Sequence, residues 1–167
     1  MNVAMVNGGN MLYLVGPKNF GSILKKIVLK YSKFPTVLVA AAKPYTTYKH
    51  DFLKLKKLFY IDCITKGVSA PKVEEDVTFL ENPQDLTSLA ISLSQFMNSL
   101  PNIKKYVVFD SLNVFFIYNS QNVVLKFVQA IVGKASATNT NIIAIATKSN
   151  EPYLSKLCVF FDRTIEL

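Results

Sequence analysis

The chain has 167 residues, half of them apolar and only 18% charged, which predicts a globular protein and excludes a disordered or coiled-coil chain. No stretch approaches the roughly 20 uninterrupted apolar residues of a membrane span, and residues 1–10 lack the basic start and apolar run of a signal peptide. We therefore expect one cytoplasmic domain over residues 1–167 without a transmembrane segment, in which Cys63 and Cys158 are free thiols.

The net charge of +8 is concentrated in the first part of the chain. Residues 1–67 hold eleven lysines against two aspartates, whereas residues 68–167 hold eight basic and nine acidic side chains. Arg163 is the only arginine, and proteins that read base sequence favour arginine. We therefore expect no base-specific recognition. A nonspecific contact of the lysines with a nucleic-acid backbone, an acidic partner or an anionic membrane surface stays open.

Apolar runs and helical spacing alternate along the chain. A buried strand is predicted at 11–15, and a helix follows that begins near Asn19 or Ser22 and ends before Pro35. A strand at 37–42, a helix at 48–58 and a strand at 59–64 come next, followed by a surface excursion over 65–76. In the second half of the chain we predict a short strand at 77–80, a helix from Asp85 or Thr87 to Leu100 and a strand at 106–111. A helix at 122–137, a strand at 142–147, a short helix or turn at 153–160 and a strand at 164–167 follow.

These strands are apolar throughout instead of at every second residue. Such strands, alternating with helices, predict an α/β fold whose mainly parallel sheet is covered by helices on both faces, in three layers. The run Tyr106–Ser111 then becomes a central strand. Its carboxyl end carries Asp110 and Ser111 to the edge of the sheet where ligands bind in such folds.

The turn after the first strand has the glycine spacing of a phosphate-binding loop. Gly16 and Gly21 stand five residues apart at a strand-to-helix turn, as such a loop requires. The lysine position, however, holds Ser22, and the position of the metal-binding hydroxyl holds Ile23. Lys18 could compensate from within the loop. We favour a structural relic over a working triphosphate site.

Asp110 is the second candidate. In a nucleotide hydrolase an acid at this place holds magnesium through water, and the alternative is that the side chain orders the following turn. A carboxylate after the second strand is missing, because Lys43 and the two residues after it occupy that place; Asp62 could face the sheet edge, or serve as a salt bridge or cap. The candidate residues of a vestigial nucleotide site are Gly16, Lys18, Asn19, Gly21, Ser22, Asp110 and Ser111. We expect no cofactor and no metal site, with ATP and magnesium through Asp110 as the alternative.

The sequence contains few residues that could form another kind of catalytic site. His50 is the only histidine and is expected to be solvated, and no metal-ligand cluster, nucleophile elbow or dinucleotide fingerprint occurs. The lysine-rich segment 49–57 is expected to be a solvated helix face. The aromatic run 115–118 is expected to belong to the core or to a subunit interface.

The chain resembles the archaeal RecA/KaiC-like P-loop superfamily, in particular its short, degenerate members of unknown function. The resemblance covers nearly the whole chain and depends on the segments Gly16–Ser22, Phe59–Thr65, Glu81–Thr87, Val107–Leu112 and Phe161–Leu167. It implies an archaeal, cytoplasmic protein and a RecA-like sheet. If 77–80 is omitted, the sheet order is 3-2-4-5-1-6 for strands numbered along the chain.

Catalysis does not carry over from the resemblance, because the loop lysine, the loop hydroxyl and the carboxylate after the second strand are all replaced. Phosphoryl transfer depends on such charges for its rate. We therefore expect a non-catalytic regulatory, signalling or protein-interaction module, which could self-associate. The alternatives are a weak nucleotide-binding protein or slow ATPase, and a nonspecific binder of nucleic acid or acidic surfaces.

Overall fold

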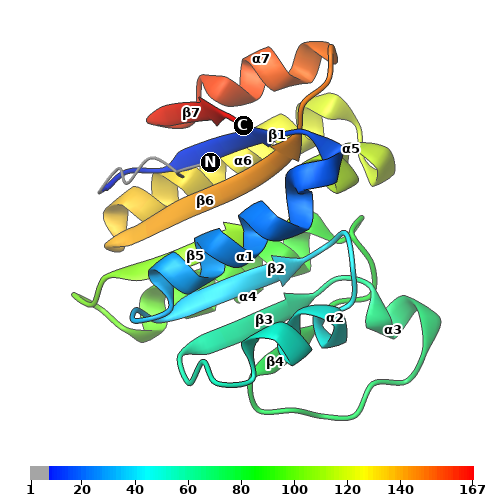
Figure 1. The fold of residues 1–167 in the computed structure, drawn as a ribbon, viewed down its shortest axis with the longest axis vertical. Helices are drawn as coiled ribbons and strands as arrows, with labels where there is room; N and C mark the ends of the chain where they lie inside the picture. Colours follow the sequence, from blue (N-terminus) through cyan, green and yellow to red (C-terminus); the bar gives the residue numbers. More distant parts are fainter. Residues whose placement is uncertain (1–7) are drawn as a thin grey trace.

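A computed structural model describes residues 8–167 (Figure 1). The first seven residues lie outside the described residues. Two predictions concern these residues: that residues 1–10 are not a signal peptide, and that the single domain covers residues 1–167. Both predictions fall partly outside the described residues.

Within the described residues, the strands form one parallel sheet in the order β4-β3-β2-β5-β6-β1-β7. The strands are β1 (Met11–Val15), β2 (Thr36–Ala40), β3 (Leu58–Asp62), β4 (Val77–Phe79), β5 (Lys105–Phe109), β6 (Thr140–Thr147) and β7 (Arg163–Glu166). The predicted order of the six main strands is confirmed. The short strand predicted at 77–80 joins the sheet as β4, at the edge beside β3.

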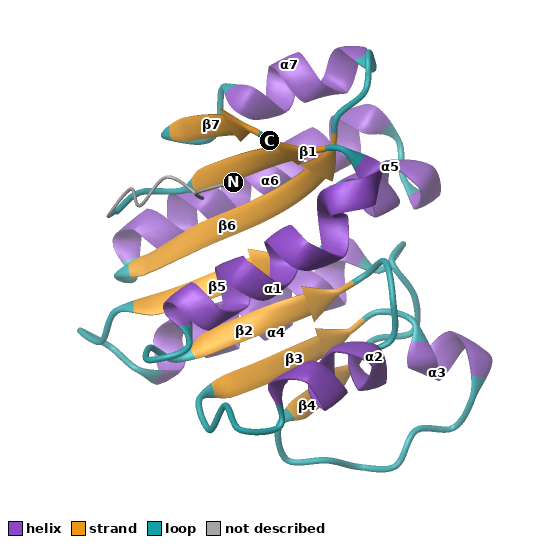
Figure 2. Cartoon of the chain, viewed as in Figure 1, coloured by secondary structure: helices purple, strands orange, loops and turns teal. Residues whose placement is uncertain are grey.

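Helices cover both faces of the sheet, so the predicted three-layer α/β architecture is confirmed (Figure 2). The α-helices are α1 (Phe20–Tyr31), α2 (Tyr45–Lys49), α3 (Thr65–Val68), α4 (Leu86–Ser99), α5 (Asn113–Tyr118), α6 (Gln121–Ala137) and α7 (Pro152–Cys158), and two 3-10 helices are η1 (Pro17–Asn19) and η2 (His50–Phe52). α1 and α2 lie on the near face in Figure 2, and α4 and α6 lie behind the sheet.

β5 shows why an apolar run becomes a central strand. Successive side chains of a strand point to opposite faces, so Val107 and Phe109 enter the core under α4 to α7, whereas Tyr106 and Val108 enter the core under α1 and α2. All five residues of β5 are buried. A strand buried on both faces carries apolar residues on both, which explains why the residues after Lys105 in β5 are all apolar and do not alternate with polar ones.

α4 begins as the sequence predicts. The Asp85 carboxylate accepts a hydrogen bond from the Ser88 N–H over 2.9 Å, which is the contact expected of an N-cap aspartate. The predicted helix at 48–58 is wrong, because α2 starts at Tyr45 and η2 ends at Phe52. The chain then turns through a hydrogen bond from the Leu55 N–H to the Phe52 carbonyl, which brings it into β3.

Lys105 lies at the amino end of β5 and is fully buried. Its ammonium group donates hydrogen bonds to the carbonyls of Leu100, Ile103 and Thr138, at 2.6, 3.1 and 3.0 Å. Leu100 and Thr138 are the C-cap residues of α4 and α6. One buried cation thus satisfies carbonyls at the ends of two helices, where positive charge is favourable.

Candidate functional site

The turn after β1 is short and closed. Gly16 alone separates β1 from η1, and α1 follows directly at Phe20. The Asn19 N–H donates to the Gly16 carbonyl over 3.0 Å, and the Gly16 N–H donates to the Leu167 carbonyl over 3.4 Å. Pro17 has no N–H. A phosphate-binding loop directs several free backbone N–H groups at one point, whereas here two of these groups are bonded within the chain.

Neither glycine of this turn is required by its backbone or its surroundings. Gly16 has a φ of −65°, Gly21 lies in α1, and a Cβ atom added at either position would meet no atom within 4 Å. The Ser22 hydroxyl donates to the Asn19 carbonyl over 3.0 Å, and Lys18 is exposed in η1. The glycine spacing therefore does not reflect the open backbone of a phosphate-binding loop.

Asp110 follows β5 and is completely buried. Its carboxylate accepts hydrogen bonds from the backbone N–H of Ala41 at 3.0 and 3.1 Å, from the N–H of Ala42 at 2.9 Å and from the Tyr48 hydroxyl at 2.9 Å. All three donors belong to the segment between β2 and the end of α2. Asp110 thus fastens the β2–α2 loop to the central strand, and its oxygen atoms are occupied by protein donors.

Burial controls the charge of this carboxyl group. Desolvation raises the pKa of Asp110 to about 6, although the hydrogen bonds from Ala42, Ala41 and Tyr48 favour the ionised form. The same burial, together with the neighbouring carboxylate, raises the pKa of Tyr48 above its ordinary value. The Tyr48 hydroxyl therefore keeps its proton and remains a donor to Asp110.

Asp62 holds the other end of the same loop. It is fully buried at the end of β3, and its carboxylate accepts from the Tyr45 N–H at 2.7 Å. It also accepts from the N–H groups of Ile64 and Thr65 at 2.8 and 2.7 Å, and from the Thr65 hydroxyl at 2.8 Å. Of the roles considered from the sequence, this geometry corresponds to a cap at the start of α3, and it also explains why α2 starts at Tyr45.

Sequence analysis missed a polar cluster between α2 and the segment before β4. The Tyr45 hydroxyl donates to Glu74 over 2.5 Å, and the Lys49 ammonium donates to Glu74 and, at 3.1 Å, to Asp76. The hydrogen bond to Glu74 is the main reason that the pKa of Tyr45 is raised to about 12. Partners separated by 25 or more residues leave no local pattern, so no signal in the sequence could have identified this cluster.

The candidate residues lie along one edge of the sheet but do not form one constellation. Asp110 bonds to the loop after β2, and the turn at Gly16 follows β1, while β6 lies between β5 and β1. Ser111 is buried next to Asp110, and His50 and Lys43 are exposed. Within residues 8–167, no three His, Cys, Asp or Glu side chains are grouped closely enough to hold a metal ion.

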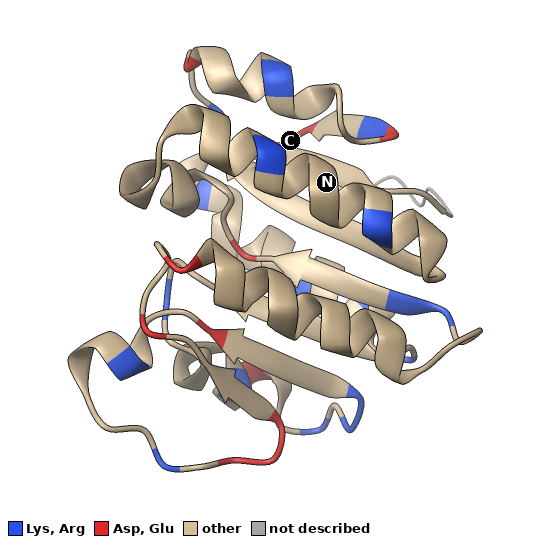
Figure 3. Cartoon of the chain, turned by 180° about the vertical axis from the view of Figure 1, so that it is seen from behind, with Lys and Arg blue, Asp and Glu red and all other residues tan. Residues whose placement is uncertain are grey.

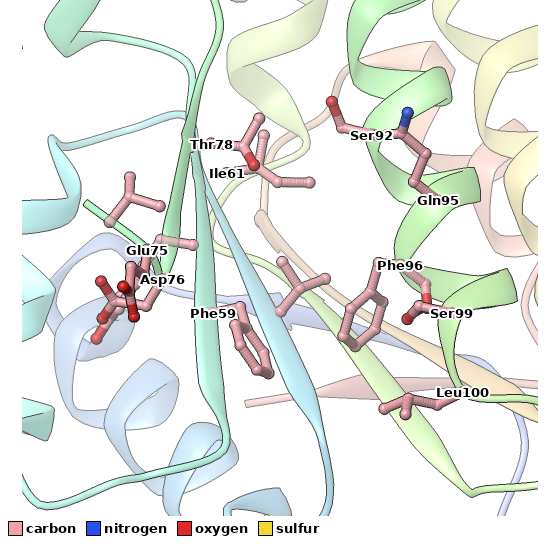
Figure 4. A pocket seen from close by; sticks show the side chains of 13 residues that line it. Phe59, Ile61, Glu75, Asp76, Thr78, Ser92, Gln95, Phe96, Ser99 and Leu100 are labelled. Atoms are coloured by element: carbon pink, nitrogen blue, oxygen red, sulfur yellow. The ribbon is translucent and has the colours of Figure 1, made fainter. Parts of the chain in front are cut away.

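A nearly uncharged helix face covers the far side of the sheet. α4 contains no charged residue, and its ribbon is entirely tan in Figure 3. Along one side of α4, a groove of about 440 Å³ separates it from β3 and β4, and Figure 4 shows Phe59 and Phe96 facing each other across it. Their ring centroids are 6.3 Å apart. A second groove of about 730 Å³ lies between α4 and α6, and half-exposed Ile91 and Val123 line it.

Comparisons with known proteins relate this architecture to solved structures. No family model and no curated protein matches the sequence. The KaiC-like protein PH0186 from the hyperthermophilic archaeon Pyrococcus horikoshii superposes with a TM-score of 0.60 at 15% identity, over 95% of this chain and 72% of that one. The chain has a RecA/KaiC-like fold. A second P. horikoshii protein, PH0250, gives a TM-score of 0.61 at 11% identity, over 95% of this chain and 81% of that one.

At these identities the likeness extends to the fold alone. The RecA/KaiC-like sheet places the turn after β1 and the carboxyl end of β5 on one edge, where the sequence predicts a vestigial nucleotide site. Among the described residues, no helix has the length and apolar character needed to cross a membrane.

Proposed function

We propose that the protein is a non-catalytic RecA/KaiC-like domain that acts as a regulatory or protein-interaction module. The observation that carries this proposal is the environment of Asp110. Its two oxygens accept from Ala41, Ala42 and Tyr48 in a fully buried position. A carboxylate has about four acceptor positions, so these three donors leave at most one position for a metal ion or its water, and the complete burial of the side chain closes it off from solvent.

The turn after β1 supports the same proposal. Active phosphoryl-transfer sites combine a loop of free N–H groups with a lysine and a metal-binding hydroxyl. Here the turn is a 3-10 helix, its serine bonds to its own backbone, and Ile23 is buried in the core.

The uncharged face of α4 supports an interaction with a second copy of this chain. Two molecules that each carry a net charge of +8 repel each other, and contact through α4 brings no charged side chain of that helix into the interface. The grooves on both sides of α4 offer apolar surface for the contact, and Ile91 lines the groove between α4 and α6.

Calorimetric titration with ATP and magnesium tests the loss of nucleotide chemistry. We expect no saturable binding and no rise in the melting temperature. Binding with a Kd below about 100 μM that disappears in Lys18→Ala, but persists in the matched control Lys134→Ala on α6, would contradict the proposal.

Sedimentation velocity over a range of concentrations tests the self-association. We expect a reversible dimer that Ile91→Lys converts to a monomer, because the new charge would be buried in the contact. The control Val73→Lys adds the same charge to a side chain that is 98% exposed elsewhere, and it should leave the dimer intact. A monomer at every concentration would reject α4 as a self-association surface.

A further inference from the structure

A basic surface with two leucines covers the face of the molecule opposite to α4. It is formed by α1 and by the connection from η2 to β3, both on the side of the sheet that faces the viewer in Figure 1. We call it the lysine–leucine face and define it by the exposed residues Lys25, Lys26, Lys33, Lys54, Lys56 and Lys57, with Leu29 and Leu53.

Two contacts hold the halves of the lysine–leucine face side by side. Near the start of α1, Lys25 lies 3.6 Å from Asp51. Beyond the end of α1, the Lys57 ammonium donates to the Lys33 carbonyl over 3.3 Å. Leu29 lies midway between Lys25 and Lys33, and Leu53 lies between Asp51 and Lys57, so the two leucines fall within the same stretch of surface.

Both leucines are exposed although their neighbours are buried. Leu29 is 47% exposed and Leu53 is 71% exposed, whereas Phe52 is 4% exposed and packs in the core. Ile27 and Val28 likewise turn the apolar side of α1 to the sheet, which leaves Leu29 on the lysine side. Fold packing does not account for two leucines on an otherwise basic surface.

The charge on this face is almost entirely of one sign. Residues 20–58 contain nine lysines and a single acidic residue, Asp51. Lys49 is bonded to Glu74 and Asp76, and Lys43 follows β2 at the other end of the sheet. The Lys30 ammonium is buried over the Tyr31 ring. The remaining six lysines belong to the lysine–leucine face, where they create a field that attracts anions.

The aromatic residues beside this face are not available to nucleic-acid bases. Tyr31 and Tyr106 stack with ring centroids 4.1 Å apart, and Phe34 lies 5.4 Å from Tyr106. Lys30 and Lys33 lie over the rings of Tyr31 and Phe34. Proteins that bind single-stranded nucleic acid stack its bases on free aromatic rings, which this surface lacks. Exposed leucines make no favourable contact with phosphate groups, so the surface suits a ligand with both anionic and apolar parts.

We propose that the lysine–leucine face binds the surface of membranes that contain anionic lipids. The lysines contact headgroup phosphates, and Leu29 and Leu53 enter the boundary between headgroups and acyl chains, which makes the protein peripheral. This inference is independent of the self-association through α4, because α4 lies on the opposite face of the sheet and would remain free.

Co-sedimentation of the full chain with lipid vesicles tests the electrostatic part. We expect binding to mixed phosphatidylcholine and phosphatidylglycerol vesicles that falls with added salt, and no binding to phosphatidylcholine alone. Lys54→Gln with Lys56→Gln should weaken binding about fivefold per lysine. The matched control, Lys134→Gln with Lys156→Gln, removes two exposed lysines from α6 and α7 and should bind like the wild type.

Serine substitutions test the apolar part at constant charge. Leu29→Ser with Leu53→Ser should weaken vesicle binding by at least about fivefold, whereas Val73→Ser should not. Binding of the same variants to duplex DNA is measured in parallel, with thermal melts to show that each variant is folded. The proposal is overturned if the wild type does not bind anionic vesicles at low salt, or if the control variants lose as much vesicle binding as the lysine and leucine variants. It is also overturned if the leucine variants bind vesicles as the wild type does and the protein binds duplex DNA more tightly than vesicles.

Discussion

Replacing Asp110 by asparagine should make the protein more stable at neutral pH. The side chain is fully buried, and an amide is close in shape and hydrogen-bonding capacity to a protonated carboxyl group. The Asn oxygen, in the place of Asp110 Oδ2, can accept from Ala41, Ala42 and Tyr48, and its amino group then takes the place of Oδ1. The substitution therefore keeps the contacts of the neutral acid and removes a buried charge.

The size of the effect follows from the pKa of Asp110. Burial raises this pKa from 3.8 to about 6, and two pKa units correspond to about 3 kcal/mol. Between about pH 4 and pH 6 the unfolded chain has lost this proton while the folded protein retains it. The stability of the wild type conferred by this group is thus fully present below pH 4 and is lost as the pH rises through 6.

Urea unfolding followed by circular dichroism measures both proteins across this range. We expect the free energies of unfolding to be about equal near pH 4, and the variant to be more stable by up to about 3 kcal/mol near pH 7. Asp51→Asn, which changes a half-exposed carboxylate, should show no such divergence. An Asp110→Asn variant that is less stable than the wild type at neutral pH would refute the reasoning, since it would mean that the hydrogen bonds outweigh the desolvation.

Three further substitutions test other parts of the fold by chemical denaturation. Lys105→Met keeps the buried stem but leaves the carbonyls of Leu100 and Thr138 without their donor, so it should cost about 2–4 kcal/mol, whereas Lys134→Met should be nearly neutral. Gly133→Ala should raise the free energy of unfolding by about 0.5–1 kcal/mol, because the position is exposed within α6 and a Cβ there meets no atom within 4 Å. The same change at Gly9 should lower it, because φ is +89° and the new Cβ would lie 2.9 Å from the Asp162 carboxylate. A neutral Lys105→Met or a destabilising Gly133→Ala would contradict these expectations.

The sheet could be predicted from the sequence because the central strands carry apolar residues on both faces instead of at every second residue, and because the strands alternate with helices. Only a parallel sheet covered on both faces buries such strands, and β1, β2, β5 and β6 are all of this kind. The segment 48–58 misled the prediction, because Lys54, Lys56 and Lys57 have the spacing of a helix surface while they stand in a turn. A tertiary hydrogen bond from the Tyr45 N–H to Asp62 sets the start of α2, and a local turn from Phe52 to Leu55 follows the end of η2. Sequence periodicity reports neither contact.

The candidate site was predictable in position but not in geometry. The sequence places Asp110 at the end of β5, where the structure has it. Its donors at Ala41 and Ala42 are backbone groups almost 70 residues away, and backbone groups carry no residue-specific signal. Likewise, Ser22 and Ile23 in the sequence reveal that the lysine and the hydroxyl of a phosphate-binding loop are missing. They do not reveal that the turn before them forms a 3-10 helix.

The two buried carboxylates also affect how the β2–α2 loop moves. Asp110 and Asp62 accept the N–H groups of Ala41, Ala42 and Tyr45, and an amide hydrogen exchanges with solvent only when its bond opens. Opening here would leave carboxylates buried without donors, so these hydrogens should exchange as slowly as those of β5. Ala42 itself is exposed to solvent, yet its amide hydrogen should have the lifetime of the core.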